Sequence, residues 1–297
     1  MAVVSLSGVT KSFGRVKAVE CVSFAVEEGE IFGLLGPNGA GKTTIIRLIL
    51  NILKPDAGEI LVFGESFAES MKSRIGYLPE ERGLYQDSSL ERVLVYLARL
   101  KGVPTSEARN RMLDFLERMD LLDCRKKKIQ ELSKGMQQKA QIIAALLHHP
   151  QLVIVDEPFS ALDPINTQMI KSLLKDLRLQ GKSIILSTHQ LNHAEELCDR
   201  ILLINQGRRI LYGALTEVLH DYSDHAILVR PSGELPDIPG IKSMQKHNQS
   251  YRLELEEMTN PQEVLSYLIS RNVSLEQFEI ATPTLEEIFI KAVTKDG

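Results

Sequence analysis

Residues 30–44 read EIFGLLGPNGAGKTT and decide the fold. Residues 30–35 form an apolar run of the kind found in buried strands. Residues 36–43 then satisfy the pattern G-x-x-x-x-G-K-[ST], and residues 43–52 have a helical pattern. A glycine-rich turn between a strand and a helix is the context in which this pattern wraps an anion with backbone N–H groups. We therefore predict a phosphate-binding loop.

Each residue type in the loop has a chemical reason. Glycines permit close approach and positive φ angles, and the start of the following helix adds a favourable dipole. Lys42 neutralises the β- and γ-phosphates of a nucleotide, and the Thr43 hydroxyl can bind Mg²⁺. Alone, the loop indicates an NTPase or a kinase. The predicted nucleotide contacts are Gly36, Pro37, Asn38, Gly39, Ala40, Gly41, Lys42, Thr43 and Thr44.

Two acidic residues end a second apolar run. Residues 152–155 are Leu-Val-Ile-Val, and Asp156 and Glu157 follow directly. A buried parallel strand that ends in carboxylates places them at the edge of the sheet where ligands bind in open α/β folds. Asp156 is therefore a candidate Mg²⁺ ligand, and Glu157 a candidate base that accepts a proton from attacking water. The alternative is a strand-end turn with solvated acids.

Strand-like and helix-like stretches alternate over the first 220 residues, which predicts an α/β fold with a mainly parallel sheet flanked by helices. Residues 88–150 are mostly helical and indicate a helical subdomain, about residues 86–150, inserted into this fold. Its predicted helices are 90–101, 106–119 and 134–148. The other predicted strands are 3–9, 19–26, 59–63, 183–187 and 200–205, and the other helices are 166–179 and 191–198.

Residues 225–297 indicate a separate, small α+β domain after a first domain of residues 1–224. Residues 250–256 alternate apolar and charged side chains, as in a half-buried antiparallel strand. Asn260, Pro261 and Glu263 predict the start of a helix that runs to about Arg271. The remaining expectations are strands at 225–230 and 273–280, a loop at 231–240 and a helix at 284–293.

Composition narrows the class of protein. The 297 residues are 43% hydrophobic and 25% charged, which indicates a globular protein and excludes a disordered or collagen-like chain. The apolar runs are shorter than the roughly 18 residues of a membrane span, and we find no signal-peptide pattern. Three widely spaced cysteines indicate reduced thiols in a cytoplasm, without a disulfide framework or zinc site.

Charge is unevenly distributed. Residues 1–224 contain 28 basic and 28 acidic residues, whereas residues 225–297 contain 7 and 11, so the net charge of −4 lies in the second domain. A nucleic-acid-binding domain is usually strongly basic, and neither domain is. We expect no nucleic-acid partner.

Further motifs appear in a fixed order. Residues 132–138 read LSKGMQQ, residues 160–163 read SALD, and His189 follows the predicted strand at 183–187. With the phosphate loop and the two acids, this order and spacing resembles the ATP-binding cassette (ABC) ATPases over roughly residues 2–220. Several motifs in fixed order are far more specific than one.

The resemblance implies a role for each matching residue. Phe13 matches the aromatic that stacks on adenine, and Asp163 matches the D-loop aspartate. His189 matches the switch histidine that contacts the γ-phosphate, so the implied catalytic residues are Glu157, His189 and Lys42. Ser133 and Gly135 match the phosphate-facing part of the signature segment. The implied ligands are ATP and Mg²⁺.

Two departures from the family pattern suggest a subfamily. Glu80 stands where a glutamine is usual, and as a carboxylate it can still bind Mg²⁺. Lys134 and Met136 alter the usual LSGGQ signature. We interpret both as variants that keep activity, since bacterial exporter ATPases resembling sodium and drug efflux cassettes show similar changes and an extra C-terminal domain.

The implied fold is a P-loop NTPase of ABC type, with an antiparallel β subdomain beside the parallel core sheet. The implied assembly is a head-to-tail dimer, homomeric or heteromeric, with two ATP molecules between phosphate loops and signature segments. Its partner would be a separately encoded membrane permease, so we expect the chain at the cytoplasmic face of a bacterial or archaeal membrane. The docking surface should lie near residues 80–85, where Leu84 and Tyr85 can supply apolar contact; an ordinary packed loop is the alternative.

The most direct interpretation is the ATP-hydrolysing subunit of an exporter, although the cassette alone hardly encodes direction and import stays open. An alternative is a soluble ABC ATPase acting on a ribosome or DNA, but the chain lacks tandem cassettes and basic arms. A non-hydrolysing interaction module conflicts with the intact Lys42, Asp156, Glu157 and His189. The basic run at 125–128 is tempting as a phospholipid or nucleic-acid patch, but a solvated loop is the simpler interpretation. The second domain is expected to be accessory, for dimer contact or regulation.

Overall fold

The structure, a computed structural model, describes residues 2–81, 83–160, 162–222, 226–247, 249–256, 258–281 and 283–295. The chain forms two compact units, Met1–Leu215 and Thr216–Gly297. The boundary expected from the sequence, between residues 224 and 225, falls in the segment 223–225, outside the described residues.

A six-stranded sheet forms the centre of the first unit, in the order β5-β6-β7-β3-β8-β9. Every neighbouring pair is parallel except β8 and β9, which confirms the mainly parallel sheet. All residues of β3, β6 and β7 are buried, because helices cover both faces of a parallel sheet. The strands are β3 (Ile31–Leu35), β5 (Ile75–Leu78), β6 (Leu152–Asp156), β7 (Ser183–Thr188), β8 (Arg200–Asn205) and β9 (Arg208–Ala214).

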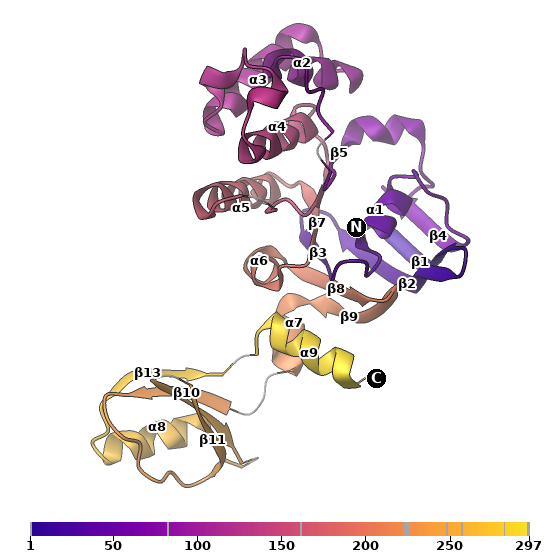
Figure 1. Ribbon diagram of the computed structural model, residues 1–297. Coiled ribbons are helices and arrows are strands. Elements are labelled where there is room, and N and C mark those ends of the chain that lie inside the picture. The colour runs from indigo at the N-terminus through magenta and orange to yellow at the C-terminus, as the bar shows by residue number, and fades with distance from the viewer. Residues whose placement is uncertain are drawn as a thin grey trace. The chain divides into compact units, whose positions relative to one another are not determined.

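Helices flank both faces of this sheet. Figure 1 shows α5 (Pro164–Leu179) and α6 (Leu191–Leu197) on one side and α1 (Lys42–Ile49) on the other. The helix predicted at 43–52 is too long, because α1 ends at Ile49 and Asn51 has a left-handed backbone with a φ of 57°.

An antiparallel sheet in the order β2-β1-β4 packs against α1. Its strands are β1 (Ala2–Phe13), β2 (Val16–Glu27) and β4 (Ala57–Val62). The first two are longer than predicted, since irregular pairing at several points lets them continue past the apolar core. One core cluster joins this sheet, α1 and the parallel strands; it includes Val4, Val22, Phe32, Ile46 and Ile154.

The inserted helical subdomain consists of α2 (Leu90–Leu100), α3 (Thr105–Arg118) and α4 (Lys134–Leu146). Figure 1 shows these helices gathered away from the antiparallel sheet. The subdomain also contains the short 3-10 helices η2 (Leu122–Cys124) and η3 (Ile129–Glu131), while η1 (Glu69–Arg74) precedes β5. The Ser133 hydroxyl caps α4 by accepting the Met136 N–H at 3.2 Å.

The second unit is a small α+β domain, as expected. Its sheet has the order β11-β12-β10-β13 with antiparallel neighbours, and α8 packs against it through Val264 and Leu268. Asn260 caps α8 by accepting the Gln262 N–H at 2.9 Å. The elements are β10 (Ala226–Pro231), β11 (Ile241–His247), β12 (Ser250–Leu255), α8 (Pro261–Ser270), β13 (Leu275–Ile280) and α9 (Leu285–Lys295), with α7 (Leu215–Asp221) before them.

No described helix is both long enough and apolar enough to cross a membrane.

Candidate functional site

The strand order explains why distant residues meet. The phosphate loop follows β3, Thr188 ends β7, Asp156 ends β6, and Glu80 lies two residues beyond β5. Since β5, β6, β7 and β3 are adjacent and parallel, their carboxyl ends lie at one edge of the sheet. The fold therefore places four segments with functional side chains at this edge.

Backbone geometry holds the phosphate loop. Gly36 and Gly41 have φ angles of 149° and 111°. A Cβ at Gly36 would lie 2.1 Å from the Ile204 carbonyl oxygen, and one at Gly41 would lie 2.3 Å from that of Ala18. Only glycine fits at these two positions without moving the neighbouring backbone.

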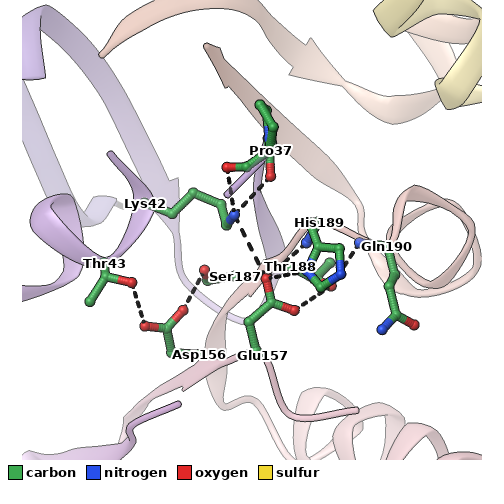
Figure 2. Close-up of polar contacts among 10 residues, drawn as sticks. Pro37, Lys42, Thr43, Asp156, Glu157, Ser187, Thr188, His189 and Gln190 are labelled. Atoms are coloured by element: carbon green, nitrogen blue, oxygen red, sulfur yellow. Dashed lines mark hydrogen bonds and ion pairs between the residues drawn. The ribbon is translucent and has the colours of Figure 1, made fainter. Parts of the chain in front are cut away.

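Lys42 is a buried cation in contact with the loop and one acid. Its Nζ donates to the Gly36 carbonyl at 2.7 Å and the Pro37 carbonyl at 3.2 Å, and lies 3.7 Å from Glu157 Oε1. Figure 2 shows the ammonium group between these acceptors. Burial lowers the pKa of Lys42, and the nearby carboxylates of Glu157 and Asp156 oppose that shift. The side chain is thus held ready for stronger anionic acceptors.

Asp156 is held by two hydroxyl groups. Ser187 Oγ donates to its Oδ1 at 2.7 Å, and Thr43 Oγ1 donates to its Oδ2 at 3.0 Å. Burial raises the pKa of Asp156, while these two hydrogen bonds pull it down. A carboxylate and a hydroxyl fixed side by side are the hard oxygen donors that Mg²⁺ prefers, so the residues present fit this ion.

Glu157 is the most constrained acid of the site. Its side chain is buried, with 5% exposure, and accepts three contacts: Thr188 Oγ1 at 3.2 Å, the His189 N–H at 3.0 Å and His189 Nδ1 at 2.9 Å (Figure 2). Its backbone has a φ of 50°, a left-handed conformation that residues other than glycine rarely adopt. Strain at a buried, fully bonded acid points to a functional constraint.

A cavity of about 650 Å³ opens beside these residues. Its volume lies in the range of small-ligand sites. Most of the predicted phosphate loop lines it, together with Asp156, Glu157 and Glu80, so the structure brings the predicted phosphate and metal residues together. The lining also includes Val16, Lys17, Ala18, Gln206 and Gly207, from β2 and the turn between β8 and β9, which the sequence analysis did not single out.

The cavity lining leaves out seven of the predicted site residues, which are Phe13, Gly36, Pro37, Ser133, Gly135, Asp163 and His189. Phe13, at the end of β1, is 49% exposed, and Val16 stands at the cavity instead. Ser133 and Gly135 lie at the start of α4, and Asp163 caps α5 by accepting the Asn166 N–H at 2.9 Å. This bond lowers the pKa of Asp163.

The structure distinguishes the two residues considered for apolar contact near residue 85. Leu84 is buried, with 9% exposure, whereas Tyr85 is 56% exposed.

The sequence analysis also did not identify Ser187 and Thr188 as residues that hold the two acids. Both hydroxyls are fully buried, and each bonds to a carboxylate of the neighbouring strand β6 or the residue after it. The available signal was a pair of hydroxyl residues ending an apolar strand directly before His189.

The mainly parallel sheet carries a phosphate loop after β3 and two acids at the end of β6, and the fold contains an inserted helical subdomain. Together these features define a nucleotide-binding protein of the ABC type. Comparison with known proteins agrees. Residues 19–160 match the family model described as ABC transporter, and residues 213–293 match the C-terminal domain described as ATP-binding protein DrrA1-3-like.

Relatives cover nearly the whole chain. The ABC transporter ATP-binding protein YhaQ of Bacillus subtilis is 38% identical over 292 residues, covering 97% of this chain and 98% of YhaQ. The Nod factor export ATP-binding protein I of Rhizobium sp. is 39% identical over 222 residues, covering 74% of this chain and 73% of that protein. A solved ATP-binding subunit of an ABC transporter, 31% identical, superposes with a TM-score of 0.69 and covers 74% of this chain and 93% of its own.

The chain therefore belongs to the ABC transporter ATP-binding proteins, in the group that carries a DrrA-like C-terminal domain.

Proposed function

We propose that this chain hydrolyses ATP to ADP and phosphate, and that the reaction drives export through a separate membrane permease. The observation that carries the proposal is the buried Glu157 carboxylate, fixed by Thr188 and His189 beside the phosphate-loop lysine. A carboxylate held at the end of a phosphate cavity has the geometry of a general base for an attacking water.

ATP binding uses the phosphate loop. Its backbone N–H groups and the start of α1 surround the phosphates, and Lys42 exchanges its bonds to the Gly36 and Pro37 carbonyls for charged phosphate oxygens. Thr43 and Asp156 would hold Mg²⁺, with Glu80 at the same cavity as a further oxygen donor. The ion, when bound, neutralises charge on the β- and γ-phosphates.

The hydrolytic step uses Glu157 and His189. Glu157 accepts a proton from the water that attacks the γ-phosphorus, while the bond from oxygen to the leaving ADP breaks. His189 keeps the carboxylate oriented through two contacts and lies at the carboxyl end of β7, where its ring can approach the γ-phosphate. Holding base and phosphate in fixed geometry is a large part of catalysis in phosphoryl transfer.

The proposal includes a head-to-tail dimer. Ser133 and Asp163 are exposed at the N-termini of α4 and α5 and do not line the cavity of their own chain. In the dimer, the start of α4 at Ser133 and Gly135 points N–H groups at the γ-phosphate bound by the other copy, and Phe13 stacks on adenine. Closure on ATP and reopening after hydrolysis supply the mechanical stroke.

Export and membrane location are part of the same proposal. A relative is named for Nod factor export, which supports an outward direction for this chain. We place the chain at the cytoplasmic face of the membrane, bound to the permease through the surface around residues 80–85.

The test is phosphate release by the purified chain, alone and with its permease, against Glu157→Gln. The glutamine keeps an acceptor for His189 but cannot take a proton, so we expect ATP binding and dimerisation to persist while turnover falls at least about 100-fold. Glu65→Gln, an exposed acid outside the site, is the control and should match the wild type. Normal turnover by Glu157→Gln would remove Glu157 as the base, and no hydrolysis by the wild type with permease would refute the ATPase.

We further propose that the second unit is accessory to this reaction and contributes dimer contact or regulation. A chain truncated after residue 222 should then change in ATPase rate, dimerisation or transport, with thermal unfolding as the check on its fold. The idea fails if all three properties equal those of the full chain.

A further inference from the structure

The helical subdomain concentrates positive charge in a chain that is acidic overall. Residues 86–150 contain 12 basic and 8 acidic residues, a net charge of +4, whereas the whole chain carries −4. The rest of the chain therefore carries −8. Four of the basic residues are consecutive, at Arg125, Lys126, Lys127 and Lys128. Such an asymmetry gives one side of a protein a distinct electrostatic preference.

Backbone hydrogen bonds fix the basic loop beside the start of α2. The Leu90 N–H donates to the Lys127 carbonyl at 2.9 Å, the Glu91 N–H donates to the Arg125 carbonyl at 2.9 Å, and Ile129 donates to Ser88 at 3.0 Å. The loop is thus held in place by its main chain, and its side chains are left to the surface.

The lysine side chains are exposed. Lys126, Lys127 and Lys128 are all exposed, and Arg125 is half-buried. None of the four forms an ion pair with a residue that the structure describes. The surrounding acids are Asp87, Glu91, Asp123 and Glu131, and Glu131 is engaged by the Lys128 backbone N–H. When Arg92 and Lys134 are counted as well, the segments 85–92 and 122–134 together carry a net charge of +2.

We infer that this surface, formed by Arg125, Lys126, Lys127 and Lys128, binds anionic lipid headgroups at the bilayer surface. The sequence alone favoured a solvated loop for residues 125–128. The change comes from the structure, in which main-chain hydrogen bonds fix the exposed lysines beside the start of α2.

Charge complementarity favours lipid over protein as the occupant. Cytoplasmic loops of membrane proteins are themselves rich in lysine and arginine, and would repel a basic surface. The cytoplasmic leaflet carries anionic headgroups, which attract lysines without needing fixed geometry. The inference rests on the proposed location of the chain at the cytoplasmic face of the membrane, and it does not depend on ATP hydrolysis.

The test is sedimentation of the full chain with phosphatidylcholine vesicles, with and without phosphatidylserine. We expect binding only to the anionic vesicles, and weaker binding as salt screens the charges. Lys126→Gln/Lys127→Gln should weaken this binding about 10- to 30-fold. Lys54→Gln/Arg109→Gln removes two exposed charges elsewhere and should change it less than about twofold.

The ATP turnover of all variants reports separately on the nucleotide site. Equal loss in the two charge variants, equal binding to neutral vesicles or no binding at all would overturn the inference. Retained vesicle binding with lost permease binding in Lys126→Gln/Lys127→Gln would also overturn it, since the surface would then face protein.

Discussion

Glu157 Oε1 receives two contacts from one neighbour, the His189 backbone N–H at 3.0 Å and the His189 ring Nδ1 at 2.9 Å. A carboxylate can only accept, so the proton of this contact lies on Nδ1. The Glu157 side chain and His189 are therefore held together by two contacts. On the other carboxylate oxygen, Thr188 donates at 3.2 Å and also accepts the Gln190 N–H at 3.1 Å.

Thr188 should act as a positioning residue for Glu157. Thr188→Val removes the hydroxyl but keeps the shape, so kcat should fall about tenfold through a misoriented base. The KM for ATP should stay within about twofold, because the phosphate loop is untouched. Thr188→Ser restores the donor and should recover most of the rate. Steady-state kinetics on the three proteins check this; a change in KM alone would contradict it.

Lys42→Met should weaken ATP binding while the protein stays folded. Loss of the cation should weaken ATP binding about 10- to 100-fold, measured by calorimetry. Removing Lys42 spares the cost of burying its charge, which its lowered pKa indicates, but it also leaves the buried Glu157 without that cation. These two effects oppose each other, so the free energy of unfolding without ATP should change by less than about 2 kcal/mol. Unchanged ATP affinity would remove Lys42 from the site, and a large loss of stability would make it structural.

Glu80→Gln tests the unusual acid at the cavity. Both side chains present an oxygen donor, so ATPase activity should stay within about tenfold of the wild type. Glu59→Gln, on β4, is a matched exposed control. A larger loss in Glu80→Gln alone would mean that the carboxylate charge itself is required.

His148 should make stability depend on pH. Burial lowers its pKa from 6.5 to about 4, while its Nε2 lies 3.0 Å from the Ile75 carbonyl oxygen. Between these values the unfolded chain binds a proton that the folded chain does not, so this contribution is complete above pH 6.5 and is lost as pH falls towards 4. Urea unfolding at pH 7 and pH 5 should show a smaller difference for His148→Asn than for the wild type. An equal difference would exclude His148 as a cause.

Much of the site could be predicted because its functional residues directly follow apolar strands in the sequence. The loop after β3 and the acids after β6 are visible as runs of apolar residues that end in functional groups. The contacts of Ser187 and Thr188 could not be predicted, since they depend on which strand β7 pairs with. Nor could the buried position of Leu84, which depends on packing around it.

Strands that contain many polar residues could not be predicted as readily from the sequence. β9 and β11 lie at sheet edges, and their sequences, RRILYGA and IKSMQKH, contain few apolar residues in alternation. Edge strands are held by backbone pairing on one side only, so their side chains carry little periodic signal.

The left-handed backbone at Glu157 does not give the protein an easy route to higher stability at this position. Glycine would adopt a φ of 50° without strain, which is worth about 1 kcal/mol. The same exchange would leave the donors of Thr188 and His189 without their acceptor, at a cost of about 1–3 kcal/mol for each buried group. The loss exceeds the relief, so a library screened for heat resistance alone should not enrich glycine at this residue.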